Sequence, residues 1–87
     1  MDGYQPDTAS SPGETIADIL KERGMSQGQF SRLMGMHAWE VHDLLFGKTT
    51  VTADVAARLE KAFGVAADFW LRRESLYRQD LVRIAGR

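Results

Sequence analysis

The sequence predicts an all-α domain of five helices, of which the last is the longest. In five segments apolar residues recur at intervals of three or four, the spacing that places them on one face of a helix. Glycines follow the first four segments, where the end of a helix favours a residue that can adopt left-handed backbone angles. No segment shows the alternation of apolar and polar residues that is typical of a strand.

The chain has 87 residues and no cysteine. A chain of this size forms one small domain, and without cysteine it has neither disulfides nor thiolate metal sites. Residues 1–12 are rich in small and polar residues and predict a disordered tail, so the domain is expected over residues 13–87. With no secretory signal and no run of about 20 apolar residues, the chain is expected to be soluble in the bacterial cytoplasm.

The first helix is predicted over residues 14–23 and ends at Gly24. Its apolar stripe contains Ile16, Ile19 and Leu20. Ser26 and Gln29 form a capping-box pattern, in which each side chain satisfies the backbone amide of the other residue, and therefore begin the second helix. Gly35 ends this helix. Its inner face is expected to consist of Phe30, Leu33 and Met34.

The third helix follows the turn at Gly35 and ends before Gly47. Its inner face is expected to consist of Val41, Leu44 and Leu45. Thr52 is predicted to cap the fourth helix, which ends at Gly64. One side of that helix is lined by Val55, Ala56, Leu59, Ala62 and Phe63.

The last helix is predicted over about residues 67–84 and extends beyond one small core. Phe69 and Leu76 lie on one face, and a second apolar stripe lies beside them. Because a monomer of this size does not cover both faces, we expect a homodimer. The expected dimer contacts are Trp70, Tyr77, Leu81 and Ile84.

The segment from Ser26 to Lys48 predicts two short helices joined by a tight turn, the unit that places its second helix in the major groove of DNA. A helical bundle with no role in nucleic-acid binding can show the same pattern. The charge is also low for a nucleic-acid binder, because the net charge is −1. Basic charge gathers in residues 72–87, with five arginines and two acidic residues, whereas residues 26–50 hold two residues of each sign.

Five groups of residues, in order along residues 11–81, carry a family resemblance. They are Pro12-Gly13-Glu14, Gly24-Met25-Ser26-Gln27, Gly47-Lys48 with Thr52, the segment 57–64, and Phe69-Trp70-Leu71 with Tyr77. With them the chain resembles the HigA-like antitoxins, a branch of the lambda-repressor-like (XRE/Cro/CI) helix-turn-helix family. The resemblance implies the lambda-repressor-like five-helix fold and a dimer that binds its own promoter. It also implies a ribosome-dependent ribonuclease toxin, encoded beside the protein and neutralised by it.

The departures from this family pattern lie in the third helix. Members usually have a polar pair such as Ser-Arg at its start, small hydroxyl residues within it, and Asn before the Gly-Lys pair. Here His37 and Ala38 stand at the start, Glu40 and His42 within the helix, and Phe46 in the place of Asn. In addition, Ala66 replaces the Ser or Thr that normally caps the last helix.

Four polar residues around the third helix are interpreted as candidates for contacts to the DNA backbone. Gln27 at a helix N-terminus and Lys48 after the third helix both suit a phosphate oxygen, as the resemblance also implies. Arg32 either reaches the backbone or serves solubility. His37 is expected to be an N-cap or a phosphate donor.

The third helix itself is expected to read bases through Trp39, His42 and Asp43. Trp39 is predicted to point outward, where it can cover a thymine methyl group or meet another protein. Asp43 can accept a hydrogen bond from cytosine N4, or form a solvated acidic face with Glu40. His42 suits a base edge or a phosphate, more strongly when protonated. The complete expected DNA-binding set is Gln27, Arg32, His37, Ala38, Trp39, His42, Asp43 and Lys48.

The sequence therefore predicts a sequence-specific DNA-binding repressor, the antitoxin of a HigBA-type toxin–antitoxin pair. No enzyme activity, metal or other cofactor is expected, because no nucleophile, base and orienting acid share an evident pocket. His37 and His42 are five residues apart and cannot hold one metal ion as an i, i+4 pair would. In the alternative, the fold is a protein-binding module in which Trp39, Phe46 and the acidic pair meet a toxin or another regulator.

Overall fold

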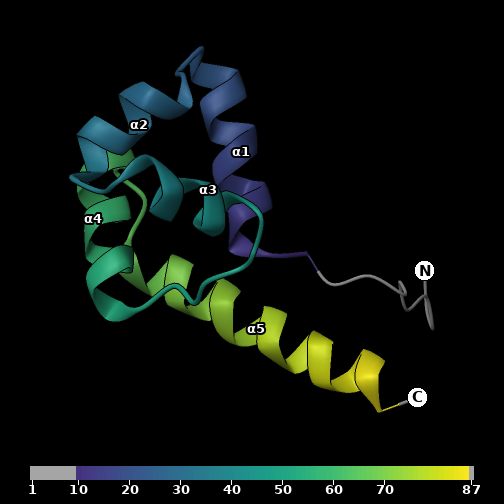
Figure 1. The fold of residues 1–87 in the computed structure, drawn as a ribbon. Coiled ribbons are helices and arrows are strands. Elements are labelled where there is room, and N and C mark those ends of the chain that lie inside the picture. The colour runs from purple at the N-terminus through teal and green to yellow at the C-terminus, as the bar shows by residue number, and fades with distance from the viewer. Residues whose placement is uncertain (1–9, 87) are drawn as a thin grey trace.

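The computed structural model describes residues 10–86, and these residues form five helices and no strand. The helices are α1 (Pro12–Arg23), α2 (Gln27–Met34), α3 (Ala38–Leu45), α4 (Ala53–Phe63) and α5 (Ala67–Ala85). In Figure 1, α1 to α4 gather around one centre, and α5 passes beneath them and extends outward as an arm. The predicted all-α, five-helix fold with a long last helix is confirmed.

The N-terminal boundary differs from the prediction because α1 begins at Pro12, two residues earlier than Glu14. Ser11 is the N-cap, and its N–H donates to Glu14 Oε2 at 3.1 Å. Pro12 at the first helical position has no N–H to leave unsatisfied and its φ already suits a helix. Ser11 and Pro12 are both buried, while residues 1–9 of the predicted tail lie outside the described residues.

One apolar core holds the helices together, and it contains a buried residue or more from every helix. Its members are Ile16, Leu20, Phe30, Met34, Val41, Leu44, Leu45, Val51, Ala56, Leu59, Phe63 and Trp70. One predicted inner-face residue is placed wrongly, since Leu33 is 52% exposed. Its side chain lies next to Arg32 and lines a groove between α2 and α4, outside the core.

Trp70 belongs to this core, so its prediction as a dimer contact is wrong. The side chain is 0% exposed within a single chain. Its ring centroid lies 6.3 Å from that of Phe63 and 5.0 Å from that of Phe69, and its Nε1 donates to Val65 O at 3.2 Å. Both the apolar area and the polar group of the indole are therefore satisfied inside the protomer.

The buried Glu74 connects α5 to the loop between α3 and α4. Its Oε1 accepts the Val51 N–H at 3.0 Å, and its other oxygen pairs with Arg78. Arg78 in turn donates to Thr50 Oγ1 at 3.3 Å. The loop that follows α3 is thus held against α5. Among the described residues, no helix has the length and apolar character needed to span a membrane.

Candidate nucleic-acid interface

The helix-turn-helix forms as its sequence predicts. The Ser26 N–H donates to Gln29 Oε1 at 2.8 Å, and Ser26 Oγ accepts the Gln29 N–H at 3.1 Å, which confirms the predicted capping box. Gln27 is therefore the first residue of α2 and is exposed there. Gly35 ends α2 with φ 67°, a left-handed conformation that costs glycine nothing. The chain then turns directly into α3.

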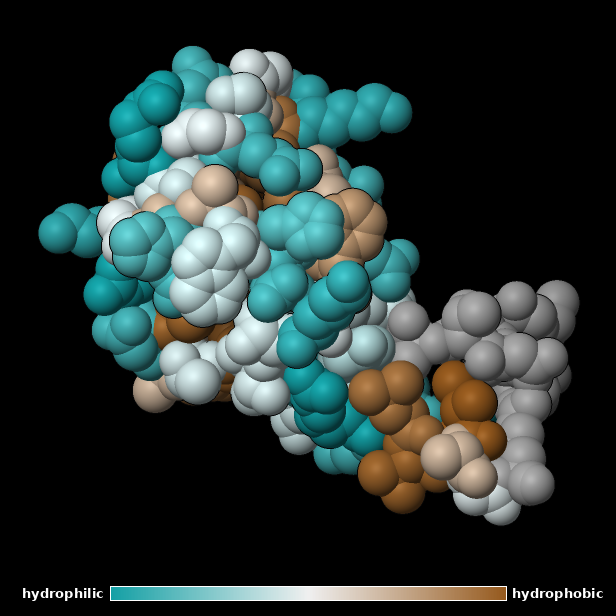
Figure 2. Space-filling view, viewed as in Figure 1, coloured by the Kyte–Doolittle hydropathy of each residue, from teal (hydrophilic) through white to brown (hydrophobic). Residues whose placement is uncertain are grey.

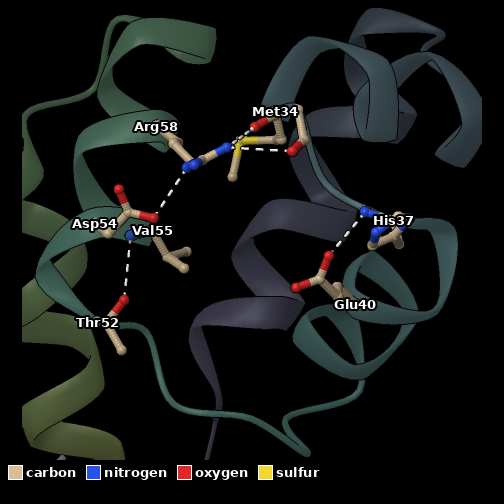
Figure 3. A network of polar contacts seen from close by, with 8 residues as sticks. Met34, His37, Glu40, Thr52, Asp54, Val55 and Arg58 are labelled. Carbon is tan, nitrogen blue, oxygen red and sulfur yellow. Dashed lines mark hydrogen bonds and ion pairs between the residues drawn. The ribbon is translucent and has the colours of Figure 1, made fainter.

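The first turn of α3 is fixed by its own side chains. The N–H of His37, the N-cap, donates to Glu40 Oε1 at 2.9 Å (Figure 3). The predicted N-cap position of His37 is confirmed. This bond uses one oxygen of the Glu40 carboxylate and leaves the other able to accept from an outside donor.

The two sides of α3 differ sharply in character. Val41, Leu44 and Leu45 are buried, as predicted. The opposite side, here called the reading face, consists of Ala38, Trp39, His42, Asp43 and Phe46. The predicted outward direction of Trp39 is confirmed, since this residue is 65% exposed, and Phe46 at the other end of α3 is 62% exposed.

Aromatic rings support one another along the reading face. The ring of Trp39 lies nearly parallel to that of His37, with centroids 6.4 Å apart and an interplanar angle of 8°. The ring centroids of His42 and Phe46 lie 4.6 Å apart. Asp43 Oδ1 lies 3.8 Å from His42 Nδ1. A cavity of about 210 Å³ adjoins Trp39 and Asp43 and continues to Thr49 and Thr50 of the next loop.

The polar residues predicted to contact phosphates lie around the helix-turn-helix. Lys48 is exposed two residues after the end of the reading face, and Arg32 is exposed on α2. The Arg32 guanidinium extends back along α2, because its Nη1 lies 4.0 Å from the position that a Cβ on Gly28 would take. It therefore approaches the same helix turn as Gln27.

Three of the four arginines of α5 make contacts within the chain. Arg73 Nη2 donates to the Thr15 hydroxyl at 3.0 Å and to the Ser11 carbonyl at 3.4 Å. Arg78 pairs with Glu74, and Arg83 Nη2 lies 3.6 Å from Asp80 Oδ1. Much of the positive charge seen in residues 72–86 therefore serves the fold.

Sequence reasoning missed Arg58, which holds the turn of the helix-turn-helix in place. Its Nη1 donates to the Met34 carbonyl at 2.7 Å and to the Gly35 carbonyl at 3.2 Å, and its Nε donates to Asp54 Oδ2 at 3.0 Å (Figure 3). Carbonyls at a helix C-terminus need such donors. The i, i+4 spacing of Asp54 and Arg58 gives a signal for the ion pair, but none for the two carbonyls.

No group of three or more potential metal ligands comes together in residues 10–86. His37 lies against Trp39 and His42 against Phe46, at different ends of the reading face. The chemistry that this surface offers is therefore apolar contact, through its rings, and hydrogen bonding, through His42 and Asp43.

Comparison with known proteins places this arrangement among helix-turn-helix proteins. A family model described as helix-turn-helix (HTH_3) matches residues 16–70. A curated relative, the uncharacterized HTH-type transcriptional regulator YddM of Escherichia coli K12, is 29% identical over 66 residues, which cover 76% of this chain and 70% of that protein.

Solved structures show the same likeness over more of the chain. An addiction module antidote protein of a HigA family from Coxiella burnetii has a TM-score of 0.81 and 32% identity, and the match covers 86% of this chain and 83% of that one. The Pseudomonas aeruginosa antitoxin HigA with the higBA promoter has a TM-score of 0.82 and 29% identity, covering 88% and 85%. PA4674 of the same organism in complex with its operator DNA has a TM-score of 0.83 and 29% identity, covering 88% and 86%.

Proposed function

The chain belongs to the HTH_3 helix-turn-helix family and to its HigA antitoxin group, and from this we propose that it is a sequence-specific DNA-binding repressor and antitoxin. The observation that carries the proposal is the reading face of α3, which is exposed, begins at a capped helix start and follows a fixed turn. Similar chains of this group include structures that contain promoter or operator DNA. The site that the chain recognises is the promoter of its own gene.

The docking follows from the positions of the two helices. In this motif the N-terminal residues of the second helix reach base edges in the major groove, while the first helix crosses the backbone. Trp39, His42 and Asp43 therefore face bases. Gln27 at the start of α2, with Arg32 beside it, and Lys48 beyond α3 face phosphates on either side.

The functional unit is a homodimer formed through the outer half of α5. Figure 2 shows apolar atoms gathered on this arm, beyond the helical core. Leu76 and Leu81 are exposed there, and the half-buried Tyr77 and Ile84 lie on the helix face between them. Val82 is also exposed, but it lies on another side of α5, beside Ser75, Arg78 and Gln79. Sedimentation of a Leu81→Glu variant is expected to show a monomer where the wild type is a dimer, and a wild-type monomer at tens of micromolar would refute this interface.

DNA binding is tested with the duplex upstream of the gene and a scrambled duplex of equal length. We expect the wild type to bind the upstream duplex at least about 1,000-fold more tightly, which is the lower range for specific recognition. Lys48→Ala is expected to weaken binding to both duplexes by a similar factor, because a phosphate contact carries no sequence information. Arg72→Ala removes a cation that is also exposed, on α5 outside the helix-turn-helix, and is the matched control, with unchanged affinity expected.

The salt dependence of this affinity measures the number of phosphate contacts. Arg32 and Lys48 supply about four neutralised phosphates per dimer, so the slope of log K against log salt should be about −3 to −4. In Lys48→Ala the slope should shrink by about two for the dimer, one for each protomer. A wild-type slope near −8 would mean that cations outside the helix-turn-helix contact the backbone.

The antitoxin role requires a toxin partner, for which we propose the product of the neighbouring gene. Co-purification of the two proteins, and relief of growth arrest when they are expressed together, test this part separately from DNA binding. The exposed Trp39 and Phe46 favour a second candidate function, in which α3 contacts a protein partner. In that case Trp39→Ala would abolish partner binding, and no specific complex with the upstream DNA would form.

A further inference from the structure

The reading face carries an unusual set of side chains for reading bases. Recognition helices commonly bond guanine through Arg or Lys and adenine through Asn or Gln, two bonds at a time. None of these four residue types occurs between His37 and Phe46. Specificity must therefore come from the acidic residues, the histidines or the apolar rings.

The polar side chains of α3 are poorly suited to most base edges. The Glu40 carboxylate accepts the His37 N–H at 2.9 Å. Asp43 Oδ1 lies 3.8 Å from His42 Nδ1, and the His42 ring in turn lies against Phe46. The two carboxylates can accept only from base amino groups, and they repel the phosphates that border the groove. The exposed apolar rings therefore offer the strongest contact that α3 can make with bases.

Trp39 is placed to make that contact. It is the second residue of α3, within the N-terminal turn that reaches the bases, and it is 65% exposed. Its indole lies nearly parallel to the His37 ring, with centroids 6.4 Å apart, and Trp39 also lines the cavity that Met36 and Leu44 border. A tryptophan side chain has only two rotatable bonds, so it loses little side-chain entropy on binding relative to its large exposed apolar area.

We propose that Trp39 selects the operator by packing against thymine 5-methyl groups in the major groove. The methyl group is the one apolar feature that a base pair presents there, and it distinguishes thymine from cytosine and from uracil. The inference rests on the proposed DNA-binding function and deepens it, because it names the chemical group that is read. The half-site accordingly contains a thymine at the position that faces the start of α3.

The test compares the upstream duplex made with thymidine to the same duplex made with deoxyuridine, which keeps all hydrogen-bonding groups and lacks only the methyl. Burial of one methyl group is worth about fourfold in affinity, so two symmetric half-sites should give about 15-fold weaker wild-type binding to the uracil duplex. Trp39→Ala should bind the thymine duplex more weakly by at least that factor and should show the same affinity for both duplexes.

Phe46→Ala is the matched control, because it removes an equally exposed ring from the other end of α3. This variant should keep the full preference for thymine, and circular dichroism should show that both variants remain folded. Equal wild-type affinity for the two duplexes, with specific binding retained, would overturn the inference and leave the proposed function intact. The same holds if Trp39→Ala keeps the full thymine preference. Absence of specific binding to either duplex would overturn both.

Discussion

Replacing Gly13 with alanine is expected to lower the free energy of unfolding by about 3 kcal/mol, the upper range for overpacking a core. A Cβ at this position would lie 2.3 Å from the Leu44 carbonyl oxygen and 2.4 Å from the Leu45 carbonyl oxygen. Both atoms are backbone at the C-terminal end of α3, so no side-chain rotation relieves the clash, and α1 must move away from α3. For a small domain with a total stability of about 5 to 15 kcal/mol this is a large loss.

Gly28 provides a control of opposite sign. It also lies in a helix, but a Cβ there would meet no atom nearer than 3.9 Å. Gly28→Ala should raise stability by about 0.5 to 1 kcal/mol, because alanine loses less backbone entropy in a helix than glycine. Urea denaturation followed by circular dichroism measures both. A Gly13→Ala variant as stable as the wild type would show that α1 and α3 do not approach so closely.

Replacing Glu74 with alanine is expected to lower the free energy of unfolding by about 2 kcal/mol. The variant leaves the Val51 N–H without its acceptor in a buried place, and it removes the partner of Arg78. Breaking a buried pair can cost about 3 to 5 kcal/mol, but the Arg78 side chain is 42% exposed and water compensates for part of that loss.

A second consequence of Glu74→Ala concerns DNA. Val51 and Thr50 are held against α5 by Glu74 and Arg78, and Lys48 lies in the same loop. Upstream-DNA affinity should therefore fall even where the variant is fully folded. Asp80→Ala is the matched control, because it breaks only the exposed pair with Arg83 and should change stability by less than about 0.5 kcal/mol. Equal stabilities of Glu74→Ala and Asp80→Ala would contradict the role of the buried carboxylate.

Local patterns predicted the elements well wherever the deciding contacts are local. The capping residues Ser26 and Thr52 begin their helices by bonding amides three residues away, at 3.1 and 3.2 Å. The helical periodicity likewise predicted which side of α3 is buried and that Trp39 is exposed. The start of α1 was predicted two residues too late, although Ser11 and Pro12 are themselves a favourable N-cap and first helical residue.

Local patterns could not predict contacts between segments that are far apart in the sequence. Trp70 lies on an apolar stripe from which a contact with a second protomer was predicted. Only the folded positions of Phe63 and Val65 show that the indole makes its contacts within its own protomer. Arg58 and Glu74 bond backbone atoms more than 20 residues away in sequence. Nothing near them in the chain indicates those partners. For the interface, sequence therefore predicted where the side chains stand, while their roles toward DNA remain predictions.

The most direct test of the account is a hydroxyl-radical footprint of the wild-type protein on the DNA upstream of its gene. A dimer that inserts one α3 into each half-site should protect two short patches whose centres are about 34 Å apart, one turn of the double helix. The patches should disappear at the same protein concentration in Lys48→Ala and persist in Arg72→Ala. Uniform protection along the duplex, or none at concentrations where the dimer is formed, would contradict the claim that α3 reads this DNA.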